Sequence, residues 1–295
     1  MSAFIDEQRA RFGVEPICRE LEVSDRAYRQ RRVAEPSRRA ESDAVILAEI
    51  QRIHTETDES YGSWRCWRQL HKDGYRVARC TVERVMRRAG LVGVQRGQTR
   101  RTTIPSAKPV AGSDLVQRRF QASRPDELWV CDFTYIRTWQ GWAYLAIVLD
   151  VYSRRIVGWQ LAPHMRDELV DDALQMAIAS RKRPGQPLVA HTDNGSQYTS
   201  WEYTQRLRDA GIAASRGRTG TALDNAMAES VIATIKTELV NRRPWPTRLD
   251  LELALLGWIG FYNQRRIHRS LGGKTPAEVT DEYHRNHEGQ PEKTN

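Results

Sequence analysis

Three carboxylates in this sequence lie where a charged side chain is costly or where a chain segment ends. Asp132 interrupts the apolar run "WVCDFTY", Asp193 closes "PLVAHTD", and Glu229 lies in "DNAMAES". A carboxylate inside an apolar strand is strongly unfavourable unless it is paired or binds a metal. Sixty residues separate Asp132 from Asp193, and 35 separate Asp193 from Glu229. If the fold brings the three together, they form a set of hard oxygen donors.

Such a donor set suits divalent-metal chemistry on phosphate esters. Asp and Glu oxygens are ligands that Mg²⁺ prefers. Two divalent ions about 4 Å apart can activate an attacking oxygen and stabilise a leaving oxygen across phosphorus. A donor set of this kind is therefore compatible with phosphodiester cleavage or transfer. The alternatives are three unrelated surface carboxylates, or an Asp193 that serves only the Asn194-Gly195 turn.

Polar residues near the carboxylates are candidates for contacts to DNA or bound water. His191 shares a strand face with Asp193, so it is a candidate for a position behind the carboxylates, with a structural histidine as an equal alternative. Asn225 and Lys236 lie four residues before and seven after Glu229, on the same helical face, and are predicted to contact DNA. A solvated lysine is the alternative for Lys236.

An alternation of strands and helices is predicted to position these residues. Three β-branched and aromatic runs predict an antiparallel meander, and the first two are joined by a tight turn. The runs cover residues 127–138, 142–153 and 155–162. A helix at 166–181, a strand at 187–193, a helix near 200–210, a strand at 212–215 and a helix opening at Asp224 follow. This βββαβαβα order predicts an α/β catalytic core with a ribonuclease H-like mixed sheet, in which Asp193 ends the fourth strand.

Several residues are expected to be structural. Asp150 is expected to bind Ser153 or Arg154. The tryptophans at 139, 142, 159 and 258 are expected in the core rather than as stacking surfaces. The four cysteines form no C-x-x-C pair, which disfavours a disulfide framework or a cysteine-rich zinc site, and they are expected as buried small hydrophobes. They are Cys18, Cys66, Cys80 and Cys131.

The excess positive charge is concentrated in one segment. The chain carries a net charge of +9, and residues 76–122 hold eleven Arg or Lys against two acidic residues. Residues 123–295 are nearly neutral, with 22 basic and 21 acidic side chains. Charge of one sign favours a polyanionic partner such as nucleic acid over a solvated linker.

Two helix-turn-helix patterns lie before or within this basic segment. The first is "VEPICRELEVSDRAYRQRR", with a helix start at Ser24 or Asp25, and the second covers residues 61–91 with a break at Asp73-Gly74. The basic side chains of the last helix and of the following run are predicted to contact DNA. They are Arg84, Arg87, Arg88, Arg100 and Arg101. A small helical domain with arginines for solubility is the alternative.

Four regions are therefore expected. A small all-α helix-turn-helix domain covers 1–93, a basic linker 94–122, the catalytic core 123–242, and a helical extension and tail 243–295. No segment is apolar enough to span a membrane and the first residues lack the apolar core of a signal peptide, so a cytoplasmic location is expected.

The motifs together resemble those of one family. "WVCDFTY", "HTDNGSQYTS", "DNAMAES" and "YNQRRIHRSLGGKTPAE", with the 35-residue gap and Lys236, are similar to DDE transposases of the retroviral-integrase-like type. More narrowly, the chain resembles the second-frame (OrfB) subunit of two-frame bacterial insertion sequences, from the helix-turn-helix region to about residue 280.

The resemblance implies a transposase that binds the terminal inverted repeats and target DNA, cleaves phosphodiester bonds and transfers strands. It implies two Mg²⁺ ions, with Mn²⁺ as a substitute, of which Asp132 bridges both while Asp193 and Glu229 each complete one. It also implies a homo-oligomer on DNA near the nucleoid, no membrane partner, and an upstream-frame OrfA protein joined by frameshift fusion. The sequence has no sustained heptad run and begins almost directly on the first helix-turn-helix pattern, so OrfA is expected to supply dimerisation.

Three other classes of protein compete with this interpretation. A ribonuclease H-like nuclease would share the fold and metals but would not explain the helix-turn-helix region. A catalytically idle regulator would be expected to have lost a carboxylate, and none is missing. A tyrosine or serine recombinase would form a covalent protein-DNA adduct.

Overall fold

The structure is a computed structural model that describes most of the chain. The described residues are 2–33, 37–95, 115–116, 120–183, 185–193, 195–217 and 226–287. The predicted contacts at Arg100, Arg101 and Asn225, and the predicted helix start at Asp224, lie outside these ranges.

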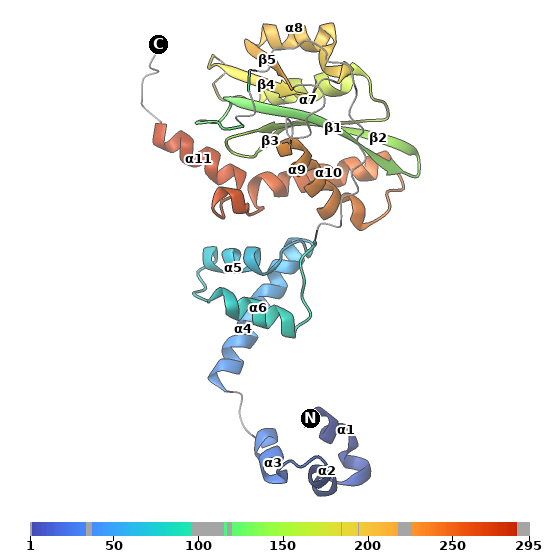
Figure 1. Cartoon of the computed structure of the whole chain (residues 1–295), viewed down its shortest axis with the longest axis vertical. Helices are drawn as coiled ribbons and strands as arrows, with labels where there is room; N and C mark the ends of the chain where they lie inside the picture. Colours follow the sequence, from blue (N-terminus) through green and yellow to red (C-terminus); the bar gives the residue numbers. More distant parts are fainter. Residues whose placement is uncertain are drawn as a thin grey trace.

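A five-stranded mixed sheet forms the centre of the catalytic core (Figure 1). Its strands are β1 (Leu128–Thr138), β2 (Gly141–Asp150), β3 (Ile156–Ala162), β4 (Leu188–Thr192) and β5 (Ile212–Arg216), in the spatial order β3-β2-β1-β4-β5. The first three strands form the predicted antiparallel meander, whereas β4 and β5 run parallel to β1. The predicted ribonuclease H-like mixed sheet is confirmed.

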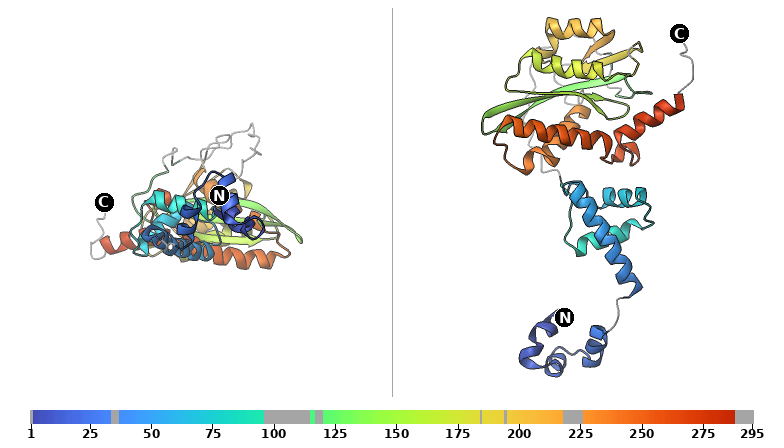
Figure 2. Two further views of the ribbon diagram at one scale, coloured as in Figure 1. Left: turned by 90° about the horizontal axis from the view of Figure 1, so that it is seen from below. Right: turned by 180° about the vertical axis from the view of Figure 1, so that it is seen from behind.

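Helices cover both faces of the sheet, and Figures 1 and 2 show the sheet between these two helical layers. The helices α7 (Asp167–Ala179) and α8 (Trp201–Asp209) pack on one face, and α9 (Ala226–Glu238) and α10 (Arg248–Gln264) on the other. The helix α11 (Pro276–His287) follows, and short 3-10 turns lie at η1 (Ser196–Thr199), η2 (Val240–Arg242) and η3 (Arg269–Leu271).

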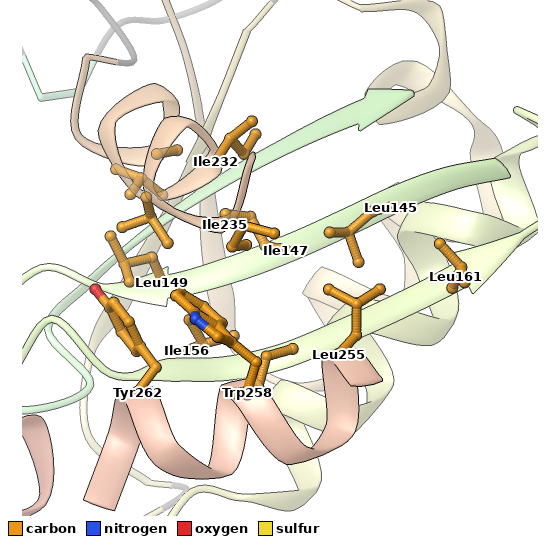
Figure 3. Close-up of a cluster of buried hydrophobic side chains, with 14 of the residues drawn as sticks. Leu145, Ile147, Leu149, Ile156, Leu161, Ile232, Ile235, Leu255, Trp258 and Tyr262 are labelled. Carbon is orange, nitrogen blue, oxygen red and sulfur yellow. The ribbon is translucent and has the colours of Figure 1, made fainter. Parts of the chain in front are cut away.

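Alternation along the strands divides their side chains between two cores. One set of alternate residues in β1 and β2 packs under α9 and α10, with Ile147, Ile235 and Trp258 among the buried members (Figure 3). The other set packs under α7, where Gly158 permits close approach. A Cβ atom at Gly158 would lie 2.1 Å from the carbonyl oxygen of Ala173. The sheet is therefore buried on both faces along most of its length.

The region before the core is helical, as predicted. The helices α2 (Val14–Glu20) and α3 (Asp25–Val33) form the first helix-turn-helix, and the Oγ of Ser24 accepts a hydrogen bond from the amide of Ala27. The helices α5 (Ser63–Lys72) and α6 (Arg79–Arg88) form the second, with the predicted break at Gly74. Two helices that the sequence analysis did not separate complete this region, α1 (Ser2–Phe12) and the long α4 (Arg38–Glu56).

Some of the expected core positions are wrong. Trp258 is buried and Trp159 is partly buried, but Trp139 and Trp142 are exposed at the tip of the β1–β2 hairpin. Cys80 is also exposed, whereas the other three cysteines are buried and all four are free. No helix in the described ranges is both long and apolar enough to cross a membrane.

Candidate catalytic site

The two aspartates lie where β1 and β4 stop pairing. The last parallel pair is Val130 with His191, and Asp132 and Asp193 each follow that pair by two residues. Ligand sites in sheets of this type form at the carboxyl ends of strands, where the strand order reverses. In this sheet β1 lies at that point, with β2 antiparallel on one side and β4 parallel on the other.

Asp132 is half-buried in the middle of β1, on the sheet face that carries α9. Its Oδ1 accepts a hydrogen bond from the amide of Phe133 at 2.8 Å. Burial first, and then the negative charges of Asp193 and Glu229, raise the pKa of Asp132 to about 8. Asp193 and Glu229 are thus close enough to Asp132 for their charges to raise its pKa.

Asp193 is exposed and is held by the turn that follows it. Its Oδ1 accepts a hydrogen bond from the amide of Gly195 at 2.9 Å. A Cβ atom on residue 195 would lie 3.0 Å from the same oxygen, so glycine allows the backbone to approach the carboxylate. Turn formation and a place at the site are therefore compatible roles for Asp193.

Glu229 and Lys236 lie two turns apart on one side of α9. Glu229 is exposed in the first turn, and Lys236 is half-buried near Asp132. Burial lowers the pKa of Lys236, and the Asp132 charge partly offsets that effect. The Nζ of Lys236 lies 5.4 Å from the ring centre of Tyr135.

His191 is fully buried behind the site. Its Nδ1 lies 3.0 Å from the Oγ of Ser215 on β5, and its ring meets that of Phe120 edge to face at 5.3 Å. This is the environment of a structural histidine, and a role for His191 behind the carboxylates stays a prediction.

The three carboxylates are not gathered into a ready metal site. Among the described residues, no three His, Cys, Asp or Glu side chains converge closely enough to hold a metal ion. A shared metal site at Asp132, Asp193 and Glu229 stays a prediction that rests on their electrostatic proximity and on their donor chemistry.

The predicted DNA contacts on α6 differ in their availability. Arg84 forms two hydrogen bonds with the Asp43 carboxylate of α4, at 2.6 and 2.7 Å, and this interaction lowers the pKa of Asp43. Its guanidinium therefore already joins two helices. Arg87 is exposed, and Arg88 lies 3.6 Å from Asp43 with most of its side chain in solvent.

A buried ionic cluster that no sequence pattern predicts lies at the C-terminal end of α9. Glu238, the last residue of α9, accepts hydrogen bonds from Arg266 at 2.7 and 2.5 Å and from Arg65 of α5 at 3.4 Å. The Tyr61 hydroxyl accepts a hydrogen bond from the amide of Ile267 at 2.8 Å. The run "YNQRRIHRS", part of a motif quoted above, therefore connects the second helix-turn-helix to the core.

A second acid outside the site behaves as predicted. Asp150, at the end of β2, accepts hydrogen bonds from the Ser153 amide at 2.7 Å and hydroxyl at 2.5 Å, and from the Asp126 amide at 2.9 Å. Asp150 therefore secures the β2–β3 turn, as the sequence analysis expected.

The sheet has the strand order of a ribonuclease H-like integrase core, and its two aspartates lie where β1 and β4 stop pairing. Helix-turn-helix units of the kind found in DNA-binding domains precede this core in the chain. Two family models described as "Integrase core domain" match residues 122–222 and 210–276, and one described as "HTH-like domain" matches 41–99. The transposase of insertion sequence element IS629 from Shigella sonnei is 46% identical over 289 residues, covering 96% of this chain and 97% of its own. The chain therefore belongs to the transposases of insertion sequence elements, and the resemblance inferred from the motifs is confirmed.

Further relatives agree with this assignment. A putative transposase of IS986/IS6110 from Mycobacterium tuberculosis (strain H37Rv) is 43% identical over 255 residues, covering 85% of this chain and 92% of its own. Transposase InsF of IS3A from Escherichia coli (strain K12) is 34% identical over 286 residues, covering 93% and 96%. Among solved structures, the HTLV-2 integrase catalytic core domain in complex with magnesium is similar to 54% of this chain and 99% of its own, with 20% identity and a TM-score of 0.43.

Proposed function

We propose that this transposase is a metal-dependent polynucleotidyl transferase whose catalytic triad is Asp132, Asp193 and Glu229. The observation that carries the proposal is the position of the two aspartates, each two residues beyond the last β1–β4 pair. The charges of Asp193 and Glu229 both raise the pKa of Asp132, which supports the same assignment. The reaction is cleavage at element ends followed by transfer of the DNA strand to a target.

The residues present fit a divalent metal such as Mg²⁺, with Mn²⁺ as a substitute. All three are hard oxygen donors. The charges of Asp193 and Glu229 also disfavour the ionised form of the half-buried Asp132, an effect that bound cations would offset. Asp132, Asp193 and Glu229 would hold the ions, and when bound two ions supply activation of an attacking oxygen and stabilisation of a leaving oxygen.

The remaining side chains bind and orient the DNA. Lys236 lies on the same side of α9 as Glu229, which suits a contact to the phosphate next to the reacting bond. The Gly195 amide fixes the rotamer of Asp193. Burial keeps His191 out of contact with solvent, which suits support of β4 behind the carboxylates.

We propose that DNA binding and catalysis are divided among the four regions predicted from the sequence. Residues 1–93 and 94–122 contact the element ends. The exposed Arg87 and Arg88 support this assignment for α6. The second helix-turn-helix is connected to the core through Glu238, so end recognition and catalysis belong to one connected unit.

We also propose that the active form is an oligomer on DNA that includes the upstream-frame OrfA protein, as a frameshift fusion. The family supports this proposal, because two element ends must be held together. An exposed apolar stripe on α10 agrees with a protein partner, since monomers seldom expose such stripes. It comprises Leu249, Leu253 and Leu256. Light scattering and strand transfer, compared at equal concentration for the isolated chain and the fusion, test this point. Full activity of the isolated chain would contradict it.

The test of the catalytic proposal is strand transfer with labelled element-end DNA and Mg²⁺. Asp132→Asn, Asp193→Asn and Glu229→Gln keep side-chain size but remove charge, and each is expected to abolish cleavage and joining while the protein stays folded. Asp209→Asn is the matched control, because it removes an exposed carboxylate of the same core on α8. Near-normal joining by a triad variant would remove that residue from the site. Hydrolysis without joining by the wild-type chain would favour a nuclease.

A further inference from the structure

Two exposed aromatic rings lie next to the candidate site at the outer part of the β1–β2 hairpin. Tyr135 and Trp142 are 55% and 48% exposed. Their rings meet edge to face, with centres 5.2 Å apart and planes at 88°. Large aromatic side chains at this exposure are costly to keep in water, so they are candidates for a binding surface.

The pairing register explains why the two rings meet. Tyr135 lies opposite Tyr144, and Arg137 lies opposite Trp142. Residues 135 and 142 are therefore diagonal neighbours on one sheet face, close enough for aromatic contact. The arrangement is fixed by two paired strands rather than by a loop.

A cation lies at each end of the aromatic pair. The Lys236 Nζ is 5.4 Å from the Tyr135 ring centre, and the Arg137 guanidinium carbon is 5.3 Å from the Trp142 ring centre. Successive contacts thus link Lys236 to Tyr135, Tyr135 to Trp142 and Trp142 to Arg137, and we name this group of four side chains the aromatic row. Alternating basic and aromatic side chains suit a nucleic acid strand, whose phosphates meet the cations while its bases stack on the rings.

The aromatic row lies beside the candidate catalytic site, around the edge of β1. Asp132 and Tyr135 are three residues apart on β1, about 10 Å along the strand, and their side chains leave opposite faces of the sheet. β4 pairs with β1 only as far as Val130. After Val130, that edge of β1 has no strand partner in the described part of the chain. Lys236 interacts with Asp132 as well as with Tyr135, so it links the two across that edge.

We propose that the aromatic row binds unpaired nucleotides of the DNA strand beside the reacting phosphate, through stacking on Tyr135 and Trp142. The proposal rests on the proposed transposase site and extends it with a base-binding surface. Bases inside a duplex stack on one another, so a ring that is half-exposed on a sheet offers its surface only to bases that have left the stack. The cations at both ends favour a polyanion over an apolar protein partner.

The test compares binding to two DNAs by fluorescence anisotropy, with the full chain and with EDTA to prevent cleavage. One DNA is a blunt duplex, and the other is the same duplex with a short oligothymidine 3′ overhang. Tyr135→Ala and Trp142→Ala are each expected to weaken binding of the overhang DNA about tenfold, equivalent to about 1.4 kcal/mol. Binding of the blunt duplex is expected to change less than twofold.

Two kinds of control separate stacking from folding. Tyr135→Phe and Trp142→Phe keep a ring and are expected to retain most of the overhang binding. Trp201→Ala removes an exposed tryptophan from α8, away from the aromatic row, and is expected to change neither affinity. Equal weakening on both DNAs, no weakening, or failure of the Phe variants to restore binding would each overturn the proposal. Loss of self-association in the Ala variants, without loss of overhang binding, would assign the surface to a second protein copy instead.

The same set of proteins distinguishes this proposal from the catalytic one. If the wild-type chain transfers no strand but the Ala variants lose overhang binding, the aromatic row is supported and the catalytic proposal fails. If transfer depends on Asp132 while the Ala variants bind both DNAs like the wild type, the aromatic row alone is wrong.

Discussion

Glu238→Gln is expected to destabilise this protein strongly, because it removes the only charge that the structure pairs with Arg266 within the described residues. The two side chains are 6% and 5% exposed and share two hydrogen bonds of 2.7 and 2.5 Å. Burial alone would lower the pKa of Arg266, and the interaction with Glu238 keeps it above its usual value. The substitution leaves a buried guanidinium without its counter-charge.

The expected size of the effect follows from that burial. Breaking a buried ion pair by removing one partner costs about 3–5 kcal/mol, since the remaining charge is neither solvated nor paired. For a chain of this size each kcal/mol lowers the Tm by roughly 2–4 °C, so the expected fall is roughly 6–20 °C. Arg65 also contacts Glu238, at 3.4 Å, so the loss should extend to the contact between α5 and the core.

The assay is thermal unfolding followed by tryptophan fluorescence and by calorimetry. Glu282→Gln is the matched control, because the Lys274–Glu282 pair has side chains 47% and 46% exposed. Exposed pairs contribute less than about 1 kcal/mol. Arg65→Ala is a second comparison that removes the α5 contact but leaves the Glu238–Arg266 pair.

If Glu238→Gln and Glu282→Gln shift the Tm equally, the buried Glu238–Arg266 pair stabilises the protein no more than an exposed pair does. A further check replaces Glu238 and Arg266 together by Leu and Met, which removes both buried charges. That double variant is expected to recover much of the lost stability, since apolar replacements of a buried pair are often neutral or stabilising.

Three other outcomes follow from the structure. Gly158→Ala is expected to lower the Tm markedly, because the added Cβ would lie 2.1 Å from a backbone oxygen of α7; an unchanged melting curve would contradict the close packing of β3 on α7. In the native protein a thiol reagent at pH 8 is expected to modify Cys80 alone, and mass spectrometry of three or four rapidly modified sites would refute the burial of the others. Arg87→Ala and Arg88→Ala are each expected to reduce the slope of log DNA affinity against log salt concentration by about one unit. Arg84→Ala is expected mainly to lower the Tm, because the Arg84 guanidinium binds Asp43. A slope change found only in Arg84→Ala would reverse these roles.

The sheet was predictable because its strands carry strong local signals. Residues 127–138 and 142–153 are rich in aromatic and β-branched side chains. β1 lies within the first run, and β2 starts one residue before the second. That first residue of β2 is Gly141, whose φ of 113° suits glycine next to the hairpin turn. The order of later strands and helices then left few topologies. The positions of Asp132 within β1 and of Asp193 directly after β4 followed from that order.

Exposure was less predictable than secondary structure. Trp139 and Trp142 are apolar enough for a core, but both are exposed at the hairpin tip, and no local pattern reveals which positions of a hairpin other elements cover. The long helix α4, by contrast, carries a clear helical pattern in its sequence. Ile46, Ile50 and Ile53 recur at helical spacing, and Ser37 caps the helix by accepting a hydrogen bond from the amide of Ala40 at 3.2 Å.

The ionic cluster at Glu238 was beyond sequence reasoning because its partners are far apart in the chain. Glu238 lies 28 residues from Arg266 and 173 from Arg65. Helical geometry gives the cluster a functional meaning. Glu238 lies nine positions after Glu229 on α9, which is about 13 Å and half a turn around the axis, so the two carboxylates point to opposite sides of one continuous helix. Glu229 faces the candidate catalytic site while Glu238 binds α5 and the segment after α10. The same helix therefore sets the position of the third carboxylate relative to the second helix-turn-helix.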